Sequence, residues 1–357
     1  MYNSIDMKKV VSFRNALIVG SILILSFFII SNRFRYYEDL QIALLDVNTA
    51  FTNLIAAFCL MYAAYSSSYN RRIMIAWTVL AAGQFAFAFG DIAWAIFEIN
   101  MSEVPFPSLA DLFYLAFYPI FAIGILLLPR EPLKFSETVK VLLDMGIVLI
   151  ASSVIFWILL IIPTLEASRD ESYLAIALAV AYPVGDLVLV FALVELLFRR
   201  IRYISVHAIM LLVAATATLI AVDFIFMRQN LLDTNDSGGF INAGYVVAYV
   251  MIGLAGISQA NSKKLDSYSE DIEPETIQFR WPLYIPYASA VATYLLLIWS
   301  YDHPMPLGFN ALSLAVGGII GLIIIRQVVA LKENAMLYEA SVKEVAERKR
   351  RRRMSGS

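Results

Sequence analysis

Ten apolar runs, each long enough to cross a lipid bilayer, follow one another along this chain of 357 residues. About 20 apolar residues cross the hydrocarbon core as a helix, because helical hydrogen bonds satisfy the backbone within the segment. With 60% hydrophobic and 16% charged residues, the composition is also unlike that of a soluble domain. The pattern predicts an all-α polytopic membrane protein. The predicted spans are 15–32, 44–66, 73–98, 108–129, 138–163, 173–198, 204–227, 240–259, 282–300 and 307–330.

Basic residues are divided unevenly between the two sides of these predicted spans. With the N-terminus inside, only four of the 27 Lys and Arg residues lie in outer segments, namely Arg33, Arg35, Arg169 and Arg228. An excess of positive charge in short loops marks the cytoplasmic side of a membrane protein. We therefore expect a multi-pass protein of the cytoplasmic (inner) membrane with both termini in the cytoplasm.

Two parts of the chain resemble each other four spans apart. Asp91 of the third span corresponds to Asp223 of the seventh, and Tyr114 of the fourth span corresponds to Tyr245 of the eighth. An even number of spans preserves direction, so the two halves would be parallel repeats; chance similarity between apolar helices explains the match equally well. The predicted organisation is an eight-span core at 1–260 with a four-plus-four repeat, an acidic cytoplasmic linker at 261–281, a terminal two-span unit at 282–330 and a cytoplasmic helix with a basic tail at 331–357.

Several acidic residues lie inside the predicted spans, where a charged side chain costs about 2.5 kcal/mol or more. Asp91 and Asp223 lie in the outer parts of their spans, Asp186 lies midway along the sixth, and Asp111 begins the fourth. No Lys or Arg lies at that depth to pair with them. These carboxyl groups must therefore be protonated, hydrogen-bonded, hydrated or bound to a cation.

Aromatic residues accompany these acids at helical spacing. Asp111, Tyr114 and Tyr118 are spaced i, i+3 and i+7, which puts them on one helix face. Pro119 and Pro183 each follow a Tyr inside a span, where a proline leaves a backbone carbonyl without its helical donor. Together they predict an outward-facing pocket for a small ligand or a cation. The predicted ligand-binding residues are Asp91, Trp94, Asp111, Tyr114, Tyr118, Tyr182, Asp186 and Asp223.

Structural roles explain some of the same residues. Tyr and Trp near span ends are typical of the interfacial belt, and Asp111 stands three residues after Ser108, as in a helix capping box. The two histidines, His207 and His303, lie outside the deep parts of the spans, and no phosphate-binding loop or nucleophile motif is present. We therefore expect no enzymatic activity, cofactor or metal site, and no nucleic-acid partner.

The last predicted span continues into a charged segment with no Gly or Pro between Gly321 and Gly356 to end the helix. Apolar residues repeat there with alternating spacings of three and four, as in a coiled coil. Such a helix would pair with a second copy of the chain or with a cytoplasmic signalling partner through 328–345. The basic tail that follows would lie near anionic lipid headgroups. The repeating positions are Val328, Leu331, Ala335, Tyr338, Val342 and Val345.

Three motifs carry a resemblance to a known kind of membrane region. They are Gly90-Asp91-Ile92-Ala93-Trp94, the segment from Pro105 to Pro119 with Asp111, Tyr114 and Tyr118, and Tyr182-Pro183-Val184-Gly185-Asp186. Together they resemble the N-terminal multi-span sensor region of prokaryotic sensor histidine kinases and diguanylate cyclases. The resemblance implies a membrane receptor in two-component or related signal transduction. In those proteins a catalytic output domain follows, whereas none follows Arg350 here. We expect a sensor module, either truncated or isolated, or one that works through a separate partner.

The expected function is therefore that of a membrane sensor, which binds a ligand in the pocket and relays the event through its last helix. The alternative is a secondary transporter of the drug/metabolite type, which also packs ten spans into a similar length. That family would repeat after five spans with inverted halves, whereas the offset here is four spans. A third reading is an assembly scaffold in which the acids only hold helices together.

Overall fold

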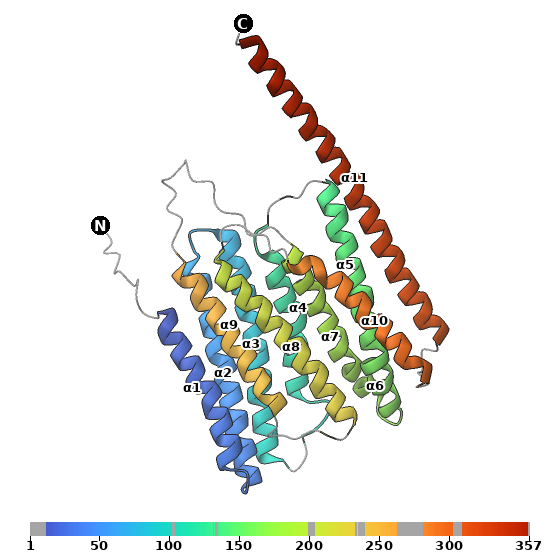
Figure 1. Ribbon diagram of the computed structural model, residues 1–357. Coiled ribbons are helices and arrows are strands. Elements are labelled where there is room, and N and C mark those ends of the chain that lie inside the picture. Colours follow the sequence, from blue (N-terminus) through green and yellow to red (C-terminus); the bar gives the residue numbers. More distant parts are fainter. Residues whose placement is uncertain are drawn as a thin grey trace, which may run out of the picture. The chain divides into compact units, whose positions relative to one another are not determined.

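The computed structural model consists of helices joined by turns, and ten of its helices are long and apolar enough to cross a membrane (Figure 1). The predicted all-α polytopic class is therefore confirmed. The chain divides into two compact units, which are described separately: unit 1 comprises 1–131 and 156–279, and unit 2 comprises 132–155 and 280–357. The structure describes residues 12–101, 104–130, 132, 135–198, 204–232, 234, 240–262, 281–302 and 309–355.

Six helices of unit 1 close into a ring. α2 packs on α3, α3 on α4, α4 on α7, α7 on α8, α8 on α9, and α9 back on α2, while α1 packs against α2 and α9. The ring thus contains two runs of consecutive elements, α2–α4 and α7–α9, and the repeat itself remains a prediction. The helical elements of unit 1 are α1 (Phe13–Arg33), α2 (Glu38–Ser66), α3 (Arg71–Asn100), α4 (Leu109–Leu127), η1 (Trp157–Ile161), α6 (Ile162–Ala167), α7 (Tyr173–Phe198), α8 (Val206–Leu231) and α9 (Phe240–Asn261).

Small residues let neighbouring helices of the ring approach closely. A Cβ atom built on Gly256 of α9 would lie 2.5 Å from the backbone oxygen of Cys59 in α2, and one on Gly124 of α4 would lie 2.8 Å from the backbone nitrogen of Leu80 in α3. Lipid chains are as apolar as Leu, so helix association in a bilayer depends on such close packing. These glycines therefore fix the distances between the helices that surround the centre of the ring.

A proline and an arginine explain the irregular helix in unit 1. η1 is a π-helical turn immediately before α6, and Pro163 follows it at the start of α6. Proline has no N–H, so it cannot donate to the carbonyl of Leu159 four residues earlier. The guanidinium of Arg228 in α8 donates to that carbonyl at 3.2 Å. One of the four basic residues predicted on the outer side thus has a structural role.

Unit 2 is organised around an ion pair that the sequence had not connected. The Arg326 guanidinium in α11 donates to Asp144 in α5 at 2.9 and 3.3 Å and to the Tyr287 hydroxyl in α10 at 3.1 Å. One turn from Asp144, Lys140 lies 2.5 Å from Glu333. These contacts group residues 132–155 with the terminal helices, whereas the sequence boundary at 260 assigned the fifth span to the core. The elements of unit 2 are α5 (Phe135–Phe156), η2 (Trp281–Tyr284), α10 (Ile285–Asp302) and α11 (Phe309–Ser355).

Substituting Gly256 by Ala should lower the thermal unfolding midpoint of the detergent-solubilised protein, because the new Cβ would overlap the backbone of Cys59. Overpacking of this kind costs about 1–3 kcal/mol. Gly317 in α11 provides a matched control, since a Cβ there meets nothing within 4 Å. The Gly317→Ala protein should unfold at or slightly above the wild-type temperature. Equal midpoints for both variants would contradict the close contact of α9 with α2.

Removing one partner of the ion pair should destabilise the protein more than removing both. The side chains of Arg326 and Asp144 are only 13% and 3% exposed, so Arg326→Gln or Asp144→Asn leaves a buried charge unpaired, at a cost of about 3 kcal/mol. The double variant should recover part of the loss in thermal unfolding. Arg169→Gln, which breaks the exposed pair with Glu166, serves as control and should change little. Strictly additive losses would show that the two buried groups do not interact.

Candidate functional site

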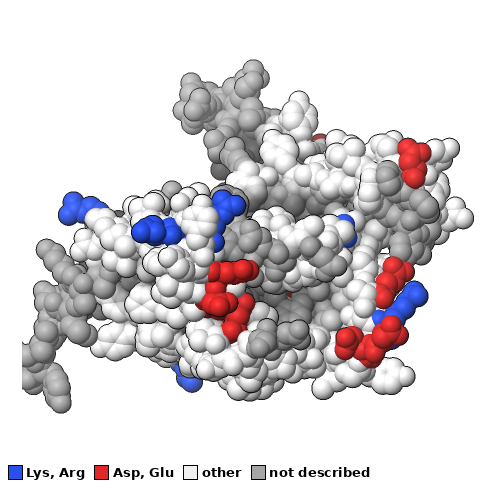
Figure 2. All heavy atoms as spheres, turned by 90° about the horizontal axis from the view of Figure 1, so that it is seen from below, with Lys and Arg blue, Asp and Glu red and all other residues white. Residues whose placement is uncertain are grey.

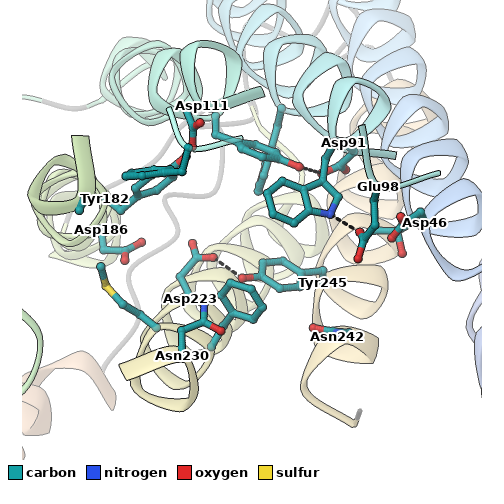
Figure 3. A pocket seen from close by; sticks show the side chains of 18 of the residues that line it. Asp46, Asp91, Glu98, Asp111, Tyr182, Asp186, Asp223, Asn230, Asn242 and Tyr245 are labelled. Carbon is teal, nitrogen blue, oxygen red and sulfur yellow. Dashed lines mark hydrogen bonds between the residues drawn. The ribbon is translucent and has the colours of Figure 1, made fainter. Parts of the chain in front are cut away.

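Unit 1 contains a cavity of about 670 Å³ inside the helix ring (Figure 3). Its walls come from the beginnings of α2, α4, α7 and α9 and from the ends of α3, α6 and α8. These helix ends meet at one end of the ring, where α3 joins α4, α6 joins α7, and α8 joins α9. This end of the ring is the pocket end. In a view toward this end, acidic side chains gather beside a hollow (Figure 2).

All eight residues that the sequence predicted for ligand binding line this one cavity. They come from α3, α4, α7 and α8, and Asp186 is the most deeply buried of the acids among them, with 1% of its surface exposed. Their convergence is a finding of the structure, whereas their binding of a ligand remains a prediction. Polar or aromatic lining residues that the prediction did not include are Phe27, Asp46, Thr49, Phe87, Glu98, Phe106, Thr164, Phe226, Asn230, Asn242, Tyr245 and Tyr249.

Asp91 of α3 is held by donors from two neighbouring helices, α2 and α4. The Asn53 amide of α2 donates to Asp91 Oδ2 at 2.7 Å, and the Tyr114 hydroxyl of α4 donates to Oδ1 at 3.1 Å. Gln84, two helical turns before Asp91 in α3, donates in turn to Asn53 Oδ1. Gly90 makes room for this contact, because a Cβ there would lie 2.6 Å from the Tyr114 ring. The Asp91 carboxylate is thus anchored by protein groups alone.

Asp223 has a corresponding environment in the second half. The Tyr245 hydroxyl of α9 donates to Asp223 Oδ1 at 2.7 Å, and the Tyr118 hydroxyl donates to Oδ2 at 3.4 Å. The bonds Tyr114–Asp91 and Tyr245–Asp223 join residues that the proposed repeat equates. In the place that Asn53 occupies beside Asp91, the second half has Asp186, whose carboxyl faces that of Asp223. The second half therefore carries one carboxyl group more than the first.

Asp111 has both of the roles that its sequence position allowed. Its Oδ2 accepts from the Ser108 backbone nitrogen at 2.6 Å and from the Ser108 hydroxyl at 2.9 Å, which forms the capping box of α4. Its Oδ1 accepts a hydrogen bond from the Tyr182 hydroxyl of α7 and so borders the cavity. The cap thus fixes an acid on the cavity wall.

A second pair of carboxyl groups was not predicted. Asp46 of α2 lies against Glu98 of α3, and Trp94 donates its indole N–H to Glu98 Oε2 at 2.5 Å. Asp46 was overlooked because it is the third residue of its predicted span, where an acid suggests a membrane boundary. The polar residues Asn48, Thr49, Thr52 and Asn53 that follow it were the available signal for a buried polar face.

The cavity combines negative charge with aromatic surface. Of its described lining residues, six are acidic, ten are aromatic, and none is Lys, Arg or His. Aromatic rings present a negative face that attracts cations, and carboxylates attract them more strongly. Among the described residues, no group of three or more His, Cys, Asp or Glu side chains is arranged to hold a metal ion. The lining of the cavity therefore favours a cation over an anion.

Comparison with known proteins identifies no relative: no protein-family model, curated protein or solved structure matches this chain.

Removing the hydroxyl of Tyr114 or Tyr245 should destabilise unit 1 by a similar amount, because each side chain donates to an aspartate within the ring. Hydrogen bonds to charged groups contribute about 1.5–3 kcal/mol. Tyr114→Phe and Tyr245→Phe should therefore lower the unfolding midpoint, whereas Tyr65→Phe, at a side chain that is 64% exposed, should not. Thermal unfolding in detergent measures all three. An unchanged midpoint for both pocket variants would show that these bonds are not stabilising.

Proposed function

We propose that this chain is the membrane-embedded sensor of a signalling system, in which unit 1 binds a small organic cation and unit 2 carries the state of the membrane part to the cytoplasm. The observation that carries the proposal is the cavity of unit 1, which is lined by acidic and aromatic side chains without a basic one among those described. A volume of about 670 Å³ lies within the usual range for small-molecule sites. The positive-inside bias of the sequence supports an orientation with the pocket end outside the cell.

Deep burial of an acid is expensive unless function or pairing compensates for it. Asp186 is buried in α7, and among the described residues no N–H or hydroxyl group donates to its Oδ1. Ionisable groups within membrane spans are by default functional candidates. Asp91 and Asp111 are satisfied by internal amide and hydroxyl donors, whereas the described contact of Asp186 is with a second acid, Asp223. A buried pair of acids supports ligand binding over a purely structural role.

The relay role rests on α11. This helix continues for 47 residues from an apolar part into a charged part. Four of the predicted heptad positions, Val328, Leu331, Tyr338 and Val342, are between 45% and 72% exposed. Apolar residues at that spacing along a helix suit pairing with another helix. We propose that ligand binding in unit 1 changes how this helix pairs with a second copy or a cytoplasmic partner.

The direct test uses pairs of probes that differ mainly in charge. Benzylammonium and tetramethylammonium should raise the unfolding midpoint of the purified full chain in nanodiscs, because a ligand that binds only the folded state stabilises it by mass action. Benzyl alcohol and benzoate should not. Asp186→Asn should weaken cation binding about tenfold or more, since it removes the charge facing Asp223, whereas Asp170→Asn, at an exposed turn position, should leave it unchanged. Stabilisation by the anion alone would refute the cation-binding function.

The relay and the transporter alternative are separated by two further measurements. A spin label on Cys at position 338, in a chain whose single Cys59 is replaced by Ala, should change its mobility or its distance to a second copy when the cation binds. The change should be lost in the Asp186→Asn protein. Uptake of the radiolabelled cation into proteoliposomes, with no change at the label, would favour the transporter.

A further inference from the structure

Two buried carboxyl oxygens on the cavity wall accept no hydrogen bond from an N–H or hydroxyl donor of the described residues: Asp46 Oδ2 and Asp186 Oδ1. Three other acids of the cavity, Asp91, Asp111 and Asp223, each accept two or more hydrogen bonds from protein donors. Leaving a buried acceptor unsatisfied costs about 1–3 kcal/mol, and more when it is charged. Each of the two open oxygens therefore marks a place where an external donor would be stabilised.

Each open oxygen belongs to a pair of neighbouring carboxyl groups. Asp186 faces Asp223 between α7 and α8, and Asp46 lies against Glu98 between α2 and α3; within each pair the two carboxyl groups are hydrogen-bonded to each other. A hydrogen-bonded pair of carboxyl groups shares one proton and keeps one negative charge, so a positive charge beside it is favourable in a low-dielectric site. An ammonium group supplies both the charge and up to three N–H donors. One such group would neutralise a pair and satisfy its open oxygen.

The two pairs lie in different parts of one cavity. In Figure 3, Asp46 and Glu98 stand on the opposite side of the pocket from Asp186, with Tyr245 in the region between them. The rings of Tyr114, Tyr245 and Tyr249 also line the cavity. Such walls suit a short hydrocarbon segment, because methylene groups gain from burial against aromatic surface.

We propose that the ligand of this cavity carries two cationic nitrogens joined by an apolar spacer, as in an α,ω-alkanediamine or a polyamine. One ammonium group binds at Asp46 and Glu98, and the other binds at Asp186 and Asp223. This inference rests on the proposed function, since it takes an organic cation as the ligand class. Once one end is bound, the second end is held near its own carboxyl pair, so the effective concentration for the second contact is high.

The test compares unbranched α,ω-alkanediamines of increasing length with monoamines of the same carbon number. Affinities are measured by isothermal titration calorimetry on the full chain in nanodiscs. One range of diamine lengths should bind at least about tenfold more tightly than the matched monoamines, and shorter diamines should lose this advantage because they cannot reach both pairs. Equal affinities at every length would overturn the two-ended ligand but leave cation binding intact. Failure of every amine to bind would instead overturn the proposed function itself.

Variants assign the two ends. Glu98→Gln should lower the affinity of the best diamine to that of its matched monoamine, because only the pair of Asp186 and Asp223 would still hold an ammonium group. Glu166→Gln, at an exposed residue, is the control and should preserve the preference for diamines. Unfolding midpoints without ligand identify any variant that is misfolded; in that case Asp46→Asn replaces Glu98→Gln at the same pair. A length preference that survives in both variants would overturn the assignment of this end.

Discussion

Carboxyl groups inside a ring of membrane helices are the constraint on which the rest of unit 1 depends. Water cannot neutralise them as it does at a protein surface, so each needs a donor, a proton or a cation. Asp91 and Asp111 receive their donors from Asn53, Tyr114, Ser108 and Tyr182, and these bonds join α2, α3, α4 and α7. The same hydrogen bonds that satisfy the acids therefore also tie the helices together. The acids that remain open face the cavity, and they give the site its preference for positive charge.

The two halves of the ring solve this problem in similar ways but not identically. In both halves a tyrosine of one helix donates to an aspartate of the preceding helix, Tyr114 to Asp91 and Tyr245 to Asp223. The glycine that allows the close approach lies beside the aspartate in the first half and beside the tyrosine in the second half: Gly90 contacts Tyr114, whereas Gly244 contacts Val222. Where the first half has the amide of Asn53, the second has the carboxyl of Asp186. If the halves descend from one repeat, this difference replaces an amide beside the aspartate with a second carboxyl group.

The sequence was sufficient to predict the class of fold, because apolar runs of this length are typical of membrane spans. It also predicted much of the pocket, because acids within such spans are rare outside functional sites. All eight predicted residues line the cavity. The carboxyl pairs could not be predicted, since they depend on which helices become neighbours in the ring. The ion pair of unit 2 could not be predicted either, because Asp144 and Arg326 are 182 residues apart and nothing in the periodicity of either span connects them. Glu98 and Asp46 lie near span ends, where sequence reasoning assigns acids to the membrane boundary.

The ion pair in unit 2 has a mechanical consequence for the long last helix. A helix rises about 1.5 Å per residue, so α11 is roughly 70 Å long. Arg326 is bound to Asp144 at a point about one third of the way along it, which leaves an arm of roughly 25 Å toward Phe309 and one of roughly 45 Å toward Ser355. A stiff rod held at such a point acts as a lever with unequal arms. A tilt that moves its membrane end by about 2 Å would swing the charged end by nearly 4 Å, enough to separate two helices whose side chains interlock.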